Sequence, residues 1–382
     1  MSREVLENYL SRSITMSGMM NGAGDLNDNL SMLKRIGAQY LGRSICLWGG
    51  ESQLLANFER ARRQMPLART ILPDAIFEAC IFEIVSTEVE QVPVPEWAFT
   101  ALGLPVEKRN FRYEAMLYPL PQRTRAWDHK SSVPDVSQAE TQIWFYYLAK
   151  TYIDLGFEGI HWGQMEIMNY NDPHLDHYAR IFQLVRSYAA RHARRGMILC
   201  NAHTPSGGLV RDGELLLDFH ALPLRIKEVS DKPQEATLEA GFVDSIYLRS
   251  KGGRTYSGWT CEHLPYLVEF DNWGVAKYPG QPRQTAGRAV KGAYWLWGYD
   301  EISWFANQKD AYRRQWLRYA WNWVRKTDPN GFLEMPGRRG VTSPLNHLIW
   351  YAANRPSPAT PEGMGDEDTI SALWNDDSGG AA

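Results

Sequence analysis

The chain has 382 residues, of which 44% are hydrophobic and 22% charged, an ordinary composition for a globular protein. Its formal net charge is -3 with scattered lysines and arginines, which argues against nucleic-acid binding, and no apolar stretch approaches the roughly 20 residues that a membrane-spanning helix needs. The charged N-terminus lacks the apolar run of a signal peptide, which slightly favours the cytoplasm over a trimmed secreted form.

Strand-like and helix-like runs alternate along the first part of the chain. Residues 13–20, 40–48 and 75–86 are predicted strands, separated by predicted helices at 30–36 and 53–72. The third strand is almost continuously apolar, as expected where both faces of a strand are buried. This alternation is typical of a parallel sheet with crossover helices.

Residues 87–136 interrupt this rhythm. The segment holds six prolines and is too long for an ordinary connection, so we expect a decorated loop after the third strand. Such insertions on a barrel usually shape the binding cleft. This one carries aromatic residues expected to line one side of it, namely Trp97, Tyr113, Tyr118 and Trp127.

The alternation then resumes. Further strands are predicted at residues 157–166, 197–203, 215–221 and 266–271. Residues 286–297 are predicted to run from a helix into the eighth strand, and a long helix at 310–325 follows. Eight strands with intervening helices close a (β/α)8 TIM barrel, predicted to form a single unit over residues 1–355. Residues 356–382 are rich in Pro, Gly and Asp, so we expect a tail whose end is disordered.

Aromatic residues are abundant, with 15 Trp and 19 Tyr. Their flat faces stack on the C–H faces of sugar rings, although large cores also use them. The four cysteines have neither metal-ligand spacing nor the density of a disulfide framework. The composition therefore favours a carbohydrate or another ring-shaped ligand.

Two carboxylates close predicted strands: Glu166 ends the fourth strand and Glu269 ends the seventh. Carboxylates are costly near a core unless they are paired or used. In a barrel of this kind the chemistry lies at the C-terminal ends of the strands. Cleavage of a glycosidic bond requires one carboxylic acid to protonate the leaving oxygen and one carboxylate as base or nucleophile.

With these two residues the chain resembles the clan A superfamily of (β/α)8-barrel glycoside hydrolases, which carry an acid/base Glu after strand four and a nucleophilic Glu at strand seven. The resemblance implies that Glu166 is the acid/base and Glu269 the nucleophile, with a carbohydrate substrate and no cofactor. A separation of about 5–5.5 Å between the two carboxyl groups would give a double displacement with retention, and one of roughly 6.5–9.5 Å would give inversion. One departure stands out. Where the superfamily usually has Asn directly before the strand-four Glu, this chain has Gln164 and Met165.

Other polar and aromatic residues share the same rim of strand ends. Hydroxyl-rich ligands need dense hydrogen-bond donors and acceptors, which Asn, His and Asp supply. Taken singly, several have structural readings, such as a satisfied core histidine, a helix cap or a packing tryptophan. The predicted substrate-binding residues are Trp48, Glu51, Glu83, His161, Trp162, Gln164, Asn201, His203, Asp218, His220, Asp271, Trp273, Trp297 and Glu301.

Two alternatives stay open. In the first, a divalent cation serves a sugar isomerase or hydrolase and is held by a mixed set of ligands drawn from Glu83, His161, His203, Asp218, His220 and Glu269. In the second, the barrel binds carbohydrate without cleaving it and needs only the aromatic residues.

Overall fold

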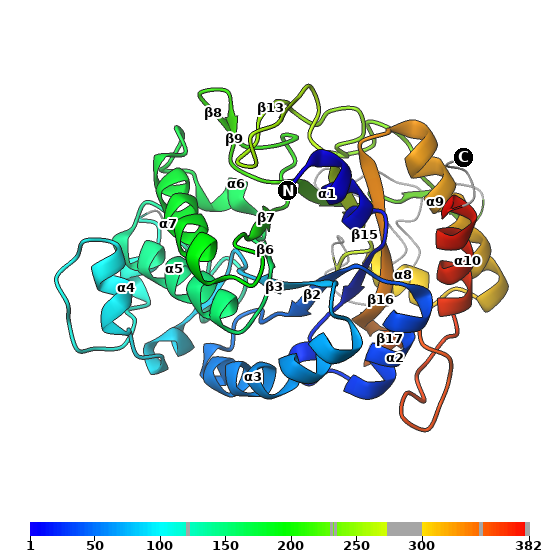
Figure 1. Cartoon of the computed structure of the whole chain (residues 1–382), viewed down its shortest axis with the longest axis horizontal. Helices are drawn as coiled ribbons and strands as arrows, with labels where there is room; N and C mark the ends of the chain where they lie inside the picture. The colour runs from blue at the N-terminus through cyan, green and yellow to red at the C-terminus, as the bar shows by residue number, and fades with distance from the viewer. Residues whose placement is uncertain (120–122, 230–231, 233–234, 273–299, 344–346, 379–382) are drawn as a thin grey trace.

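The computed structural model describes residues 1–119, 123–229, 232, 235–272, 300–343 and 347–378. In this part of the chain, parallel strands follow one another in chain order around a barrel, and the last strand pairs with the first (Figure 1). A parallel bridge between His203 and Ala221 joins the fifth and sixth strands. The barrel strands are β1 (Ser13–Met16), β2 (Tyr40–Ile45), β3 (Ile76–Cys80), β6 (Gly159–His161), β7 (Leu199–Asn201), β10 (His220–Pro223), β15 (Tyr266–Glu269) and β16 (Gly331–Thr342). The predicted (β/α)8 barrel is confirmed.

Helices surround the barrel and α1 (Arg3–Leu10) lies before the first strand. Local sequence sets their ends: Asp25 caps α2 by accepting from the Asp28 N–H, and Gly37, at φ +75°, ends it in the left-handed conformation. None of the described helices is long and apolar enough to cross a membrane. The others are α2 (Leu26–Ile36), α3 (Leu54–Ile71), α5 (Ala139–Asp154), α6 (Met165–Met168), α7 (Asp176–His192), α8 (Glu301–Ala306), α9 (Asp310–Thr327) and α10 (Glu367–Ser378), with short 3-10 helices η1 (Met19–Asn21) and η2 (Glu51–Gln53).

The long insertion predicted after β3 is present and contains short strands and helices of its own. Its ends pair in a small antiparallel sheet of β4 (Val85–Ser86) and β5 (Ser131–Ser132), while Phe111 and Met116 bury themselves in the main core. Between these strands lie η3 (Thr87–Gln91), α4 (Glu96–Ala101) and η4 (Glu114–Met116). The insertion is therefore packed against the barrel and not a free loop.

Minor strands lie outside the barrel. Strand β17 (Leu348–Ala352) pairs antiparallel with β16. The remaining short strands form two small sheets, composed of β8 (Val210–Arg211), β9 (Glu214–Leu215), β13 (Gly253–Arg254) and β14 (Thr260–Cys261), and of β11 (Lys227–Glu228) and β12 (Ala236–Thr237).

The barrel interior changes character along the strands. At its lower end Tyr40, Ile76, Leu199 and Leu267 form an apolar cluster that Leu6 and Leu10 of α1 join. Because side chains alternate along a strand, the residue two positions farther on points to the same interior. Those positions hold Gly42, Glu78, Asn201 and Glu269, so the upper interior is polar.

The predicted eighth strand is wrong. The place between β15 and β1 belongs to β16, and α9 precedes this strand where we expected a helix after it. Strand β16 contains three glycines and a proline, which are rare within strands, so its sequence does not predict a strand. Gly337 is needed there because a Cβ would come within 2.5 Å of the Met16 sulfur. Residues 286–297 lie outside the described part of the chain.

Two further boundaries differ from expectation. The sixth strand begins at His220: residue 215 belongs to β9, and residues 216–219 form bends between the two strands. The segment after residue 355 contains α10, which ion pairs tie down: Arg35 of α2 contacts Glu367, and Arg313 of α9 contacts the neighbouring Asp366. Residues 379–382, where we expected disorder, are not described.

Candidate active site

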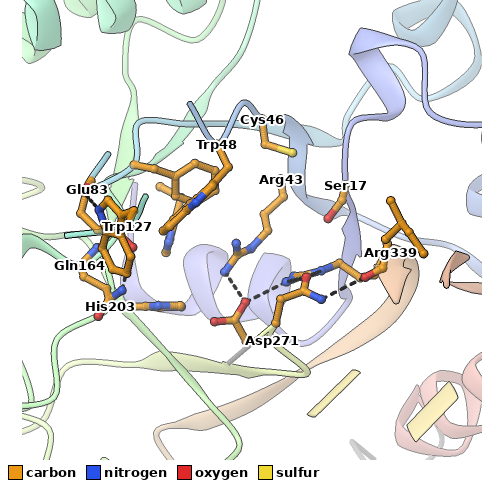
Figure 2. A pocket seen from close by; sticks show the side chains of 16 residues that line it. Ser17, Arg43, Cys46, Trp48, Glu83, Trp127, Gln164, His203, Asp271 and Arg339 are labelled. Atoms are coloured by element: carbon orange, nitrogen blue, oxygen red, sulfur yellow. Dashed lines mark hydrogen bonds and ion pairs between the residues drawn. The ribbon is translucent and has the colours of Figure 1, made fainter. Parts of the chain in front are cut away.

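A cavity of about 710 Å³ opens at the C-terminal ends of the barrel strands, where the chemistry of this fold is located (Figure 2). Its lining comes from the C-terminal parts of β2 and β16, from positions at or after the ends of β1, β3, β6, β7 and β15, and from the insertion and β17, so most of the barrel contributes. The lining residues are Ser17, Arg43, Cys46, Trp48, Phe82, Glu83, Trp127, His161, Gly163, Gln164, His203, Asp271, Asn272, Arg339, Gly340 and Leu348.

Arg43 enters the cavity from a distorted part of β2. It has a positive φ of 55°, and the pairing of β2 with β3 shifts register between Leu41 and Ile45. Its backbone N–H donates to Glu78 Oε2 at 2.9 Å, which helps to hold this conformation. Such strained non-glycine residues persist where the surroundings fix them, often at functional sites. The distortion turns the guanidinium towards strand seven.

Glu269, at the end of β15, lies just behind the cavity wall and is 1% exposed. Its Oε1 accepts from Arg43 Nη2 at 2.6 Å and from His203 Nε2 at 2.7 Å. Its Oε2 accepts from Arg43 Nε at 3.0 Å and from Arg339 Nη1 at 3.1 Å. Burial alone raises the pKa of Glu269, but Arg43, His203 and Arg339 outweigh it and hold this pKa well below its usual range. The carboxylate is therefore ionised and fully hydrogen-bonded.

Asp271 lies two residues farther along the same strand direction and lines the cavity. Its Oδ1 accepts from Arg43 Nη2 at 3.1 Å and from Arg339 Nη2 at 2.8 Å, the two contacts drawn in Figure 2. Within the described residues, Oδ2 accepts no hydrogen bond from a side chain or backbone. Burial favours the neutral acid, yet Arg43 and Arg339 lower the pKa of Asp271 below its ordinary value. Asp271 thus offers the cavity an ionised carboxylate with one oxygen that no donor among the described residues occupies.

Glu83 supplies a second cavity carboxylate, from the chain that follows β3. It accepts from the Gln164 backbone N–H at 2.9 Å and from Gln164 Nε2 at 2.7 Å. In an eight-stranded barrel, strands three and seven lie on opposite sides, so Glu83 and Asp271 face the cavity from opposite walls (Figure 2).

Aromatic rings form the wall beside Glu83. Trp48 contacts both Phe82 and Trp127 edge to face, each at 5.2 Å between ring centroids. Trp48 is 50% and Trp127 38% exposed, which leaves ring surface available to a ligand. Trp127 belongs to the insertion and donates its indole N–H to the Glu83 carbonyl at 3.0 Å, so the insertion completes the cavity.

Two histidines line the wall between these carboxylates. His203 binds Glu269, as described above, and its ring centroid lies 4.7 Å from that of His161 in an edge-to-face contact. His161 is 2% exposed, and its Nδ1 lies 2.7 Å from Asn201 Oδ1. Both rings are thus held in fixed positions.

A second set of acidic groups lies below the cavity. Glu78 accepts from the Tyr40 hydroxyl and from Asn201 Nδ2, both at 2.6 Å. Burial raises the pKa of Glu78, and burial together with the charges of Glu269 and Glu78 raises that of Glu334 well above its usual value. Arg43 and Arg339 supply two positive charges for four carboxyl groups, and burial with its charged neighbours favours the neutral acid most strongly at Glu334.

Several predicted site residues lie within or beside the cavity. Trp48, Glu83, His161, Gln164, His203 and Asp271 line it, and Asn201 and Glu269 support lining residues from behind. Trp162 is different: its ring is fully buried between Phe145 and Phe182, on the side of β6 that faces the helices. Trp273 and Trp297 fall outside the described residues.

Other predicted site residues lie away from the cavity lining. Glu166 sits on α6, where both its oxygens are 3.3 Å from the Ser206 N–H, because Gly163 turns the chain at φ +55° after β6. Glu51 binds the Ser86 N–H and hydroxyl. Asp218 pairs with buried Arg186 at 2.9 Å. Each of these carboxylates thus binds groups outside the cavity lining.

His220 and Glu301 are also buried away from the lining. His220 lies 3.3 Å from Thr204 Oγ1 and packs so closely on Gly208 that a Cβ there would come within 2.2 Å of the ring. Glu301, in the first turn of α8, accepts from the Ile226 N–H at 3.2 Å, and burial raises its pKa to about 8.

Sequence reasoning missed the two arginines of the site. Arg43 lies in a strand that the sequence predicts, and Arg339 lies in β16, which it does not. An arginine buried in a strand is expected to pair with a carboxylate. Arg43 interrupts the apolar run 40–48, a signal that was visible in the sequence. Arg339 was not predicted as a site residue, because the strand that carries it, β16, was not predicted.

His203, Glu269 and Asp271 also converge closely enough to suggest a metal site, with ligand atoms within 4.8 Å of one another. However, Arg43 and Arg339 already donate to both carboxylates. A cation placed there would meet two guanidinium groups. This donor set therefore fits a divalent cation poorly.

Comparisons with known proteins give a distant likeness. No family model matches the chain, and no curated protein matches it. Among solved structures it is similar to the GH113 β-mannanase AaManA from Alicyclobacillus acidocaldarius in complex with ManMIm, at 10% identity and a TM-score of 0.42, over 96% of this chain and 97% of that chain. The barrel assignment rests on the strand pairing described above, and the site chemistry rests on this chain's own residues.

Proposed function

We propose that the protein is a glycoside hydrolase and that its reaction takes place in the cavity at the strand ends. The observation that carries the proposal is the pair of carboxylates, Glu83 and Asp271, on opposite walls of a cavity lined by tryptophan rings. A sugar ring stacked on Trp48 or Trp127 would present its glycosidic bond between two carboxyl groups, as this hydrolysis requires.

In the first step Asp271 attacks the anomeric carbon through Oδ2, the oxygen left open by Arg43 and Arg339. A nucleophile must be ionised, and the two guanidinium groups favour that state. Glu83 donates its proton to the departing oxygen. In the second step Glu83 takes a proton from water, which displaces Asp271 and releases the sugar. This is the double displacement of a retaining glycoside hydrolase.

Glu269 has a positioning role in this proposal. Both its oxygens already accept two donors each, so it has no free lone pair to direct at a sugar. It holds Arg43, His203 and Arg339 around Asp271. In this proposal Glu83, and not the expected Glu166, is the acid/base residue. Glu83 lines the cavity, whereas Glu166, on α6, contacts the backbone N–H of Ser206.

The test is hydrolysis of a panel of aryl glycosides by the wild type and by Glu83→Gln, Asp271→Asn and Glu166→Gln. Loss of a catalytic carboxyl group is expected to lower kcat by about 10²- to 10⁴-fold in the first two variants. Glu166→Gln is the matched control and should retain wild-type activity. Loss of activity in Glu166→Gln alone, or abolition by a chelator, would contradict the proposal.

A further inference from the structure

The His161 ring holds an unpartnered nitrogen within the wall of the cavity. The ring lines the cavity and is 2% exposed, and its Nε2 is buried with no hydrogen-bond partner in the part of the chain that the structure describes. A buried polar atom without a partner costs free energy, which a ligand that binds it recovers. The question is whether Nε2 offers a proton or a lone pair.

A chain of hydrogen bonds fixes the answer. Asn201 Nδ2 donates to Glu78 Oε1 at 2.6 Å, so the amide oxygen of Asn201 is turned towards His161. A carbonyl oxygen can only accept, and therefore His161 Nδ1 carries the proton and donates at 2.7 Å. In the neutral ring this leaves Nε2 as a lone pair.

The surroundings keep the ring neutral. Burial is the largest cause, and His203 and Arg43 add to it, while Glu269 and the bond to Asn201 oppose it, so the pKa of His161 falls to about 3. At neutral pH the lone pair on Nε2 is therefore always available. Nearby Arg43 disfavours a cation at this point, and a lone pair repels an anion.

We propose that His161 Nε2 accepts a hydrogen bond from a hydroxyl group of a neutral sugar ring in the cavity, and so helps to select and orient the substrate. The inference rests on the proposed function, since it names a group that this function requires of its ligand. A hydroxyl suits the site because it donates one hydrogen bond without bringing a charge.

His220 provides a matched control within the same chain. It too is fully buried, with a pKa lowered to about 3 by burial and a buried Nε2 that lacks a partner among the described residues. It packs against Thr204 and Gly208, away from the cavity lining. A substitution there disturbs the core in the same way without reaching the ligand.

The first arm of the test observes the histidine nitrogens of the whole protein by ¹⁵N–¹H NMR. His161 should stay in the Nδ1–H form, without titrating, from roughly pH 5 to pH 9. Addition of the aryl glycosides of the panel should move the Nε2 resonance of His161 and leave that of His220 unchanged. A protonated Nε2 in the free protein, or no movement with any glycoside, overturns the inference.

The second arm compares His161→Phe with His220→Phe on the best substrate of the panel and on its monodeoxy analogues. Loss of the acceptor should lower kcat/KM by about 10- to 100-fold in His161→Phe only. With the wild type, kcat/KM for one deoxy analogue should be lower than for the parent substrate by the same factor. With His161→Phe, that analogue and the parent substrate should have equal kcat/KM. If His161→Phe does not fold, His161→Gln, whose amide oxygen accepts, replaces it and should retain discrimination against that analogue.

The two proposals fail in different ways. If glycosides move the Nε2 resonance but none is cleaved, the binding role stands and the hydrolase proposal fails. If glycosides are cleaved with an unmoved resonance and an undiminished His161→Phe, the hydrolase proposal stands and the role of His161 is overturned.

Discussion

The lower and upper halves of the barrel interior are built on the same strands but do opposite things. Below, Ile76, Leu199 and Leu267 pack with α1 in an apolar cluster. Two residues farther along, Glu78, Asn201 and Glu269 replace them and are buried just as deeply. Apolar burial stabilises the fold, whereas buried charges cost free energy unless they are paired. Apolar burial in the lower half therefore offsets the free-energy cost of burying the charged groups of the upper half.

The largest effect should follow from breaking the ion pairs of the upper half. Arg43→Met leaves Glu269 and Asp271 with one guanidinium group between them, and removing one partner of a buried pair costs about 3–5 kcal/mol. We expect that loss in the free energy of unfolding, measured by urea titration, together with loss of glycoside hydrolysis. Unchanged stability would show that the pairing contributes little to the upper half.

A substitution in the lower half should separate stability from activity. Leu267→Ala removes a fully buried side chain, which costs about 3 kcal/mol in the free energy of unfolding. The folded variant should keep the wild-type kcat, because Leu267 lies below the polar cluster. A fall in kcat as large as that of Asp271→Asn would mean that the two halves are not independent.

Glu301 tests the cost of burying an acid beside the site. Its pKa is about 8 in the folded chain and near 4.3 when unfolded, so the folded state holds its proton more tightly. That contribution to stability is complete below about pH 4.3 and is lost as the pH rises towards 8. Glu301→Gln, which stays neutral, should raise the Tm relative to wild type at pH 8 and not at pH 4. An equal Tm difference at both pH values would contradict this assignment.

The smallest effect is expected at the aromatic wall. Trp127→Ala removes a partly exposed ring that the insertion brings to the cavity, and one ring stacked on a ligand contributes about 1 kcal/mol. We expect KM for the best aryl glycoside to rise several-fold with little change in kcat. A matched Trp97→Ala variant, whose ring packs on Tyr147 away from the cavity, should leave KM unchanged.

The sequence revealed the barrel because most of its strands are apolar runs separated by turn residues. Strand β16 was missed because Gly337 and Pro336 serve a close approach to β1 that depends on tertiary contacts. The helix α10 was missed because ion pairs from distant segments, such as Arg313 to Asp366, hold the tail in place. A local sequence pattern shows neither a close contact between strands nor an ion pair between distant segments.

The site was predictable where alternation alone decides direction. Glu269 ends β15 and Asp271 follows two residues later; Glu269 lies just behind the cavity wall and Asp271 lines the cavity. Glu166 does not line the cavity, because Gly163, two residues after the end of β6, has a positive φ and the chain then enters α6. A Cβ at Gly163 would lie 2.1 Å from Glu83 Oε2, so that glycine makes room for the carboxylate from the segment after β3. Such an approach between segments cannot be read from spacing.

The most direct test of the account is to trap the covalent intermediate. The protein is incubated with 2-deoxy-2-fluoroglycosyl fluorides matching the sugars accepted from the aryl panel, and the labelled peptide is identified by mass spectrometry. The account predicts one sugar per chain, attached to Asp271, with labelling abolished in Asp271→Asn and retained in Glu166→Gln. A label on Glu269 or Glu166, or no label on a protein that hydrolyses the corresponding glycosides, would contradict it.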